Sequence, residues 1–221
     1  MNEKEGLLGS LSALQRLALA YAPARAAAPT LALFALDVRL AGIVRSASEP
    51  MLAQLRLAWW REQLEASVGT LPAGEPLIAV LESWTGSRRA LVGLAEGWEE
   101  MTGPAPLAGS AIERLAEARA EAFCGLCDQI APKRDRAEAR RLGYNWALAD
   151  IAANLSHPEE RRTAAELASA QDWRAAPMSR AMRPLVVLHG LAARATRRGE
   201  GLNELPPSAM FAALRLGLFG R

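Results

Sequence analysis

Two polar side chains in a largely apolar segment lie on one helix face, where they could share a metal ion. Asp150 and Asn154 lie four residues apart in LGYNWALADIAANL (residues 142–155), so both would project from one face of an α-helix. Magnesium is a hard cation that takes oxygen ligands. The pair is therefore a candidate for a residual metal site, and the alternative is a hydrogen-bonded pair inside a helical bundle.

Several arginines near one carboxylate form a candidate anion site. Asp37 and Arg39 lie in ALFALDVRLAGIV (32–44), Arg45 follows that segment, and Arg61 lies in LRLAWWREQL (55–64). Guanidinium groups bind phosphates and carboxylates, so these residues could hold an anionic head group. The alternative is that they are solvated or paired with one another at helix ends.

Other chemistry has little support in the sequence. Cys124 and Cys127 form a C-x-x-C, but no second cysteine pair exists, and His157 and His189 are isolated, so a zinc site is not expected. Two reduced thiols packed in a helix, and a core position for His189, are the simpler interpretation. The chain has no serine nucleophile elbow, phosphate-binding loop or dinucleotide fingerprint.

The chain carries six tryptophans, which allow two interpretations. Aromatic faces attract cations, so some of them could surround an apolar or a cationic ligand. Tryptophan also fills helical bundles without any ligand, and core packing is the simpler expectation. The six are Trp59, Trp60, Trp84, Trp98, Trp146 and Trp173.

Composition bounds the class of protein. The 221 residues fit one domain (1–221), and a net charge of +2 gives no reason to expect a nucleic-acid partner. The N-terminus has early acidic residues and no long apolar core, unlike a secretory signal. No apolar run reaches the roughly 18 residues of a membrane-spanning helix. We therefore expect a cytoplasmic protein.

The pattern of residues predicts an all-α fold. Val, Ile and Thr are sparse, and apolar residues recur at intervals of three and four. Helix starts are expected near Pro29, at Ser48 with Pro50, and at a capping box formed by Ser110 and Glu113. Breaks are expected at residues 69–76, 101–109, 157–158, 175–177 and 199–207. Segments 51–64 and 142–155 are apolar on two sides, which predicts that both helices lie at the centre of a bundle.

These segments, in this order, resemble the squalene/phytoene synthase family. The resemblance rests on Tyr21, ALFALDVRLAGIV (32–44), LRLAWWREQL (55–64), LGYNWALADIAANL (142–155), RPLVVLHGLA (183–192) and PPSAMFAALRLGLFGR (206–221). It implies the isoprenoid-synthase fold, a helical bundle around a central cavity. It also implies an activity, the condensation of two prenyl diphosphates, with magnesium held by aspartates on two facing helices.

The chain departs from the family where the aspartates should be. The first acidic cluster falls at Arg39, Leu40 and Ile43, with Asp37 nearby, and the second falls near residues 154–158. The arginine that usually precedes the second cluster corresponds to Ala153. An arginine in the first cluster opposes magnesium binding. The departures resemble those of the branch that contains relatives of a mitochondrial complex I assembly factor.

Two functions follow from this resemblance. The first is a non-catalytic protein without a cofactor, acting as an assembly factor with a protein partner or as a lipid-binding factor with an isoprenoid or lipid ligand. The alternative is a divergent prenyltransferase acting on isoprenoid diphosphates. In that case Arg39 and Arg61 would bind diphosphate, and Asp150 and Asn154 would bind Mg²⁺.

The C-terminal region suggests peripheral contact with a membrane. Eight arginines and three acidic residues follow Gln171. The last predicted helix places Phe211, Leu214 and Leu218 on one side, with Arg215 and Arg221 available to phosphates. An amphipathic basic helix can lie on a membrane surface, and the alternative is that it docks on its own bundle.

Overall fold

The structure, a computed structural model, describes residues 3–47, 49–66, 76–84, 88–204 and 208–220. These residues form α-helices, short 3₁₀ turns and loops, and no β-strand occurs among them. The predicted all-α fold is therefore confirmed.

The helices are connected mainly by short loops and 3₁₀ turns. They are α1 (Glu3–Ser10), α2 (Ala13–Ala20), α3 (Ala24–Ser46), α4 (Pro50–Glu65), α5 (Pro76–Leu81), α6 (Arg89–Glu99), α7 (Gly109–Ile130), α8 (Arg136–Asn154), α9 (Pro158–Ser169), α10 (Arg183–Arg198) and α11 (Ser208–Phe219). The 3₁₀ turns are η1 (Glu100–Thr102), η2 (Lys133–Asp135), η3 (Arg180–Met182) and η4 (Leu202–Glu204).

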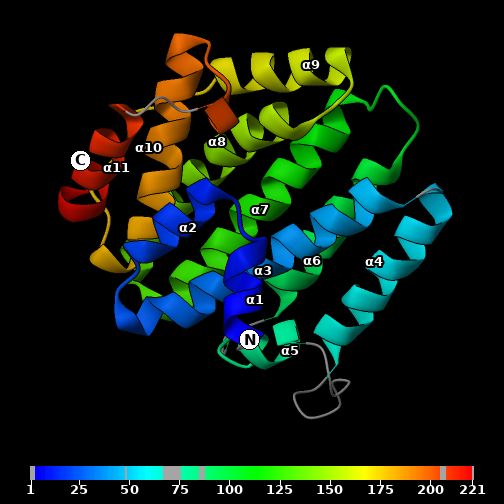
Figure 1. The fold of residues 1–221 in the computed structure, drawn as a ribbon, viewed down its shortest axis with the longest axis horizontal. Coiled ribbons are helices and arrows are strands. Elements are labelled where there is room, and N and C mark those ends of the chain that lie inside the picture. The colour runs from blue at the N-terminus through cyan, green and yellow to red at the C-terminus, as the bar shows by residue number, and fades with distance from the viewer. Residues whose placement is uncertain (1–2, 48, 67–75, 85–87, 205–207, 221) are drawn as a thin grey trace.

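Helix α7 runs through the middle of the bundle (Figure 1). It packs against α6 on one side and α8 on the other, and α3 also contacts both α6 and α7. Helix α4 packs on α6, while α10 joins α8 to α2 and α11. As a result α4 and α11 lie at opposite ends of the long axis (Figure 1).

Helix α3 is the most thoroughly buried long helix near the N-terminus. Its buried residues run without interruption from Pro29 to Asp37. It is the one helix in the described ranges that is long and apolar enough to cross a membrane, yet 67% of its most apolar window is buried inside the protein. Packing on all sides explains why a helix of such composition belongs in the core.

Two glycines let the central helices approach closely. A Cβ on Gly97 of α6 would lie 2.5 Å from the Cβ of Ala118 on α7, and a Cβ on Gly143 of α8 would lie 3.0 Å from the ring of Phe123. Such contacts are too short for a larger side chain. The glycines therefore bring α6 and α8 onto opposite sides of α7, close to the position of Arg119.

The helix boundaries correct part of the sequence prediction. Pro50 is the first residue of α4, as predicted, while Ser48 lies outside the described residues. Pro29 does not start a helix, because α3 begins five residues earlier. Helix α7 begins without a side-chain cap, so the predicted capping box at Ser110 is wrong. A capping box does form at Ser12 and Gln15 of α2.

The predicted breaks mostly separate helices. Residues 101–109, 157–158, 175–177 and 199–207 lie at or between helix ends, although 205–207 are outside the described residues. The break at 69–76 lies outside them as well, except for Pro76, which starts α5.

The two helices predicted to lie at the centre have different environments. In α8 the residues Trp146, Leu148 and Ile151 are buried, as predicted. In α4 only one of the two apolar stripes is buried, and the other, which includes Leu55 and Trp59, is exposed. Helix α4 thus lies at the edge of the bundle, and the prediction of a central position for it is wrong.

Candidate functional site

A buried arginine joins the two carboxylates that the sequence singled out. Arg119 of α7 donates from Nε and Nη2 to the two oxygens of Asp37 on α3, at 3.0 and 2.8 Å. Its Nη1 donates to Oδ2 of Asp150 on α8, at 2.9 Å. Arg119 is only 5% exposed. One guanidinium therefore links three helices at the centre of the bundle.

Two tryptophans lie beside the same guanidinium. The Arg119 Cζ is 5.1 Å from the ring centre of Trp98 and 5.2 Å from that of Trp146. Trp98 also donates from Nε1 to Oδ1 of Asp37, at 2.8 Å. Trp146 packs edge-on against Phe123 at 5.6 Å. The cation that these aromatic faces attract is thus a side chain of the protein itself.

The charges of this cluster depend on one another. Burial lowers the pKa of Arg119, but Asp37 and Asp150 more than offset it, so the net pKa is raised and the guanidinium stays charged. Burial also raises the pKa of Asp150, since Arg119 opposes this only in part and the Asp37 charge adds to it. The cluster contains one cation and two carboxylates, and the ion pairs between them stabilise these buried charges.

Little space is left around the cluster. The cavity lined by Asp37, Arg119, Trp146 and their apolar neighbours has a volume of about 10 Å³. A single water molecule needs a cavity of roughly this size. No isoprenoid chain can enter this cavity without displacing the side chains that fill the centre.

Asp150 and Asn154, the candidate metal ligands, do lie together. Asn154 donates from Nδ2 to the backbone oxygen of Asp150 at 2.8 Å and to its Oδ1 at 3.3 Å. This is the hydrogen-bonded pair that the sequence offered as an alternative, although Asn154 itself is exposed. In the described part of the chain, no group of three or more His, Cys, Asp or Glu residues could hold a metal ion.

The two arginines proposed to bind diphosphate differ in their exposure to solvent. Arg39 of α3 is exposed. Arg61 of α4 is half-buried and pairs with Glu99 of α6, with 3.2 Å between Nη1 and Oε2. Burial raises the pKa of Glu99 and Arg61 opposes that rise. Arg61 therefore stabilises the contact between α4 and α6 through an ion pair.

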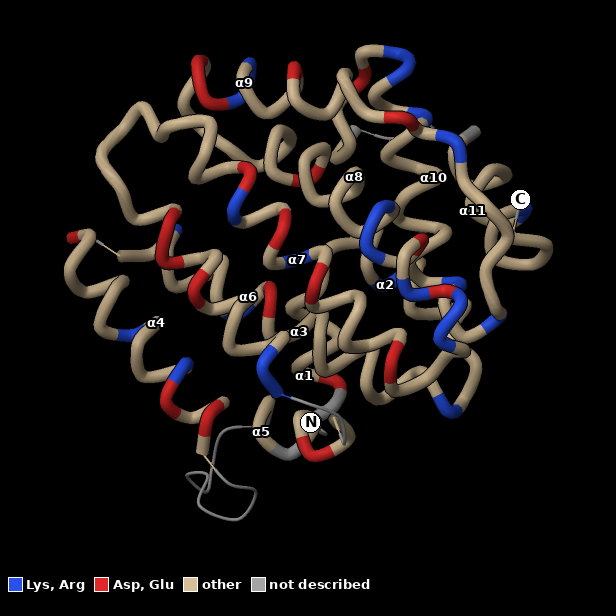
Figure 2. Tube along the Cα trace, turned by 180° about the vertical axis from the view of Figure 1, so that it is seen from behind, with Lys and Arg blue, Asp and Glu red and all other residues tan. Residues whose placement is uncertain are grey.

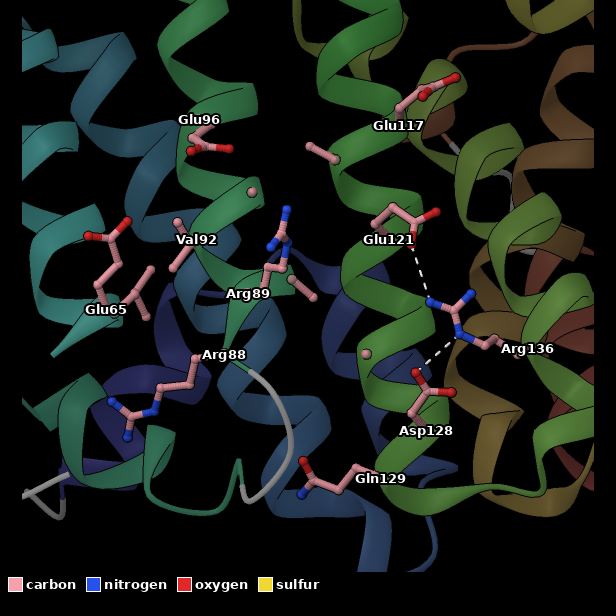
Figure 3. Close-up of a pocket in the computed structure, with 15 residues that line it drawn as sticks. Glu65, Arg88, Arg89, Val92, Glu96, Glu117, Glu121, Asp128, Gln129 and Arg136 are labelled. Carbon is pink, nitrogen blue, oxygen red and sulfur yellow. Dashed lines mark hydrogen bonds and ion pairs between the residues drawn. The ribbon is translucent and has the colours of Figure 1, made fainter. Parts of the chain in front are cut away.

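A separate groove of about 1190 Å³ runs between α4, α6 and α7 (Figure 3). Its walls carry acidic side chains, among them Glu65, Glu96 and Glu117, facing a few arginines. Arg136 pairs with Asp128 at 3.1 Å and also with Glu121. The mixture of charges is typical of a solvated surface and provides no convergent binding group.

The cysteines and His189 are buried side chains, as predicted. Cys124 and Cys127 are free, and burial raises the pKa of their thiols to about 12 and about 11. Such thiols are protonated at neutral pH and unreactive. Burial lowers the pKa of His189 to about 4, and its ring stacks on Trp173 at 5.2 Å. His157 precedes Pro158, the first residue of α9.

Arg119 is the functional residue that the sequence analysis missed. It falls on the same face of α7 as the buried residues Ile112, Leu115, Ala116 and Phe123. A charged residue on an otherwise apolar helix face needs a partner inside the protein. The position of Arg119 on this apolar face could therefore have been used to predict a buried acidic partner elsewhere in the chain.

Comparisons of the chain with protein-family models, curated proteins and solved structures found no match. The resemblance to squalene/phytoene synthases therefore stays a prediction from the sequence motifs.

Proposed function

We propose that the protein is a non-catalytic member of the squalene/phytoene synthase family that acts as an assembly or lipid-binding factor. The observation that carries this proposal is the pairing of Arg119 with both Asp37 and Asp150. In the family, aspartates on two facing helices hold magnesium ions. Here the carboxylates nearest to those positions, Asp37 and Asp150, pair with a guanidinium.

This pairing opposes magnesium chemistry at the bundle centre. Mg²⁺ requires about six oxygen ligands in near-ideal geometry. The oxygens of Asp37 already accept three hydrogen bonds, from Arg119 and Trp98, and Asp150 accepts from Arg119 and Asn154. A metal ion could enter only if the buried guanidinium left, and that step would cost several kcal/mol for each uncompensated charge.

The shape of the centre favours a surface function over an internal lipid site. The cavity beside Arg119 holds about 10 Å³, which excludes a prenyl chain. A protein with a packed centre can still act through its surface, by binding a protein partner or a membrane. We therefore place the assembly function ahead of lipid binding inside the bundle.

The alternative, a divergent prenyltransferase, would need other groups. Arg61 would have to leave Glu99 to bind diphosphate, and Asp150 with Asn154 would have to bind Mg²⁺ in competition with Arg119. Nothing in the described geometry favours these changes.

Titration with prenyl diphosphates tests the proposal. Farnesyl and geranylgeranyl diphosphate would be added to the purified protein with and without Mg²⁺ in a calorimeter, and the same samples assayed for released diphosphate. We expect neither magnesium-dependent binding nor release. Binding that needs magnesium and is followed by release would make the protein an active synthase. Binding without release would identify a lipid-binding factor.

A further inference from the structure

The C-terminal helix α11 carries its large apolar side chains on the outside. Phe211 is 77% exposed and Leu218 is 57% exposed. Met210, Leu214 and Phe219 are exposed as well. The helix contains a single charged residue, Arg215, and no acidic residue, and most of its trace in Figure 2 is uncharged.

Small residues on the opposite face fix this orientation. Ala209, Ala213 and Gly217 are buried against the bundle. A Cβ at Gly217 would overlap the ring of Tyr21, and a Cβ at Gly190 of α10 would overlap Leu216. The helix cannot turn its large side chains inward, because only the small face fits. The exposed apolar face is thus a stable property of the fold.

Arginines that have no carboxylate partner among the described residues lie on or beside the same helix. Arg183 of α10 lies against Gly220, at the end of α11. Burial, and then the nearby Arg180, lower the pKa of Arg183, so these two cations are close together. No ion pair joins Arg180, Arg183 or Arg215 to a carboxylate in the described ranges. Arg221, which the sequence placed with them, lies outside the described residues.

We propose that the outer face of α11, with Arg180, Arg183 and Arg215, docks the protein on an anionic lipid surface. A helix of 12 residues is about 18 Å long, far short of the roughly 30 Å of a bilayer core, so it would lie along the surface. Phenylalanine and leucine enter the boundary between head groups and acyl chains, while arginines bind lipid phosphates.

Charge favours a lipid surface over a second copy of the chain. A symmetric dimer through α11 would bring the same face of each copy together and enclose both copies of Arg215 in one interface. The helix offers no acidic residue to pair with it. An anionic membrane supplies the missing negative charge. This inference concerns the surface and is independent of whether the bundle centre is catalytic.

Vesicle binding of the full chain tests the proposal. The protein would be sedimented with phosphatidylcholine vesicles and with vesicles containing about a third phosphatidylglycerol, and we expect binding about tenfold stronger to the anionic vesicles. The variant Phe211→Ser with Leu218→Ser should lose this binding. Arg180→Gln with Arg215→Gln should lose mainly the preference for anionic lipid.

A matched control comes from the other end of the molecule. Met51 and Leu55 of α4 are 68% and 62% exposed, so Met51→Ser with Leu55→Ser removes a similar apolar area. This variant should bind vesicles as the native protein does. The proposal is overturned if the native protein does not bind anionic vesicles, or if the α4 and α11 variants lose vesicle binding equally. It is also overturned if the native protein binds no vesicles but self-associates, and only the α11 variant abolishes that self-association.

Discussion

The arginines of the bundle centre and those at the outer face of α11 have opposite environments. At the centre, Arg119 is enclosed by two carboxylates and two tryptophans, and each of its three nitrogens has a hydrogen-bond partner. Arg215 lies on α11 among exposed apolar side chains, and Arg183 lies against the end of this helix. Neither arginine pairs with a carboxylate in the described part of the chain. The difference indicates that the centre maintains the fold, and it is the basis of the proposal that α11 docks on an anionic lipid surface.

Removing the central cation should give the largest effect on stability. Arg119→Ala leaves two buried carboxylates without compensation, which should lower the free energy of unfolding by about 3–5 kcal/mol. Denaturant titration would measure the loss. Arg119→Lys keeps the charge without the planar fork and should lose less. Equal stability of the native protein and Arg119→Ala would contradict the account of the centre.

The reactivity of cysteine thiols can be compared directly between the interior of the bundle and α11. Because burial raises the pKa of Cys124 and Cys127 to about 12 and about 11, these thiols should react with a disulfide reagent at pH 8 at least about a hundredfold more slowly than a free thiol. A cysteine introduced by Leu218→Cys on α11 should react at the ordinary rate. Three equally fast thiols would mean that the interior opens readily.

A smaller effect is expected from disturbing the inner face of α11. Gly217→Ala places a methyl group against Tyr21 and should cost about 1–3 kcal/mol by overpacking. The damage should stay local, with faster proteolysis near α11 than in the rest of the bundle. Gly42→Ala is the control, since no atom lies within 4 Å of the added Cβ, and it should be neutral or stabilising.

Sequence patterns predicted the helices better than their places in the bundle. Periodicity locates both α4 and α8 because it depends on residues close together in the chain. Both helices carry two apolar stripes, but only α8 is covered on both sides. Whether a second stripe is covered depends on neighbouring helices, and the sequence of α4 alone contains no such information.

The candidate site was predicted only in part for a similar reason. Asp37 was recognised as the carboxylate among several arginines, and Asp150 by its four-residue spacing to Asn154. Their common partner is separated from them by 82 and 31 residues, and no local spacing connects the three. The buried position of Arg119 on α7 was readable, but its choice of partner depends on how α3, α7 and α8 pack.

Magnesium-dependent thermal stability tests the central claim most directly, namely that Arg119 compensates two buried carboxylates, Asp37 and Asp150, that would otherwise be free to bind a cation. The melting temperature of the native protein should not change with Mg²⁺. Arg119→Ala frees two facing carboxylates, and Mg²⁺ at about ten times its dissociation constant should raise that variant's melting temperature by about 3–5 °C. Arg119→Lys should not respond. A magnesium-dependent rise in the native protein, or none in Arg119→Ala, would contradict the account.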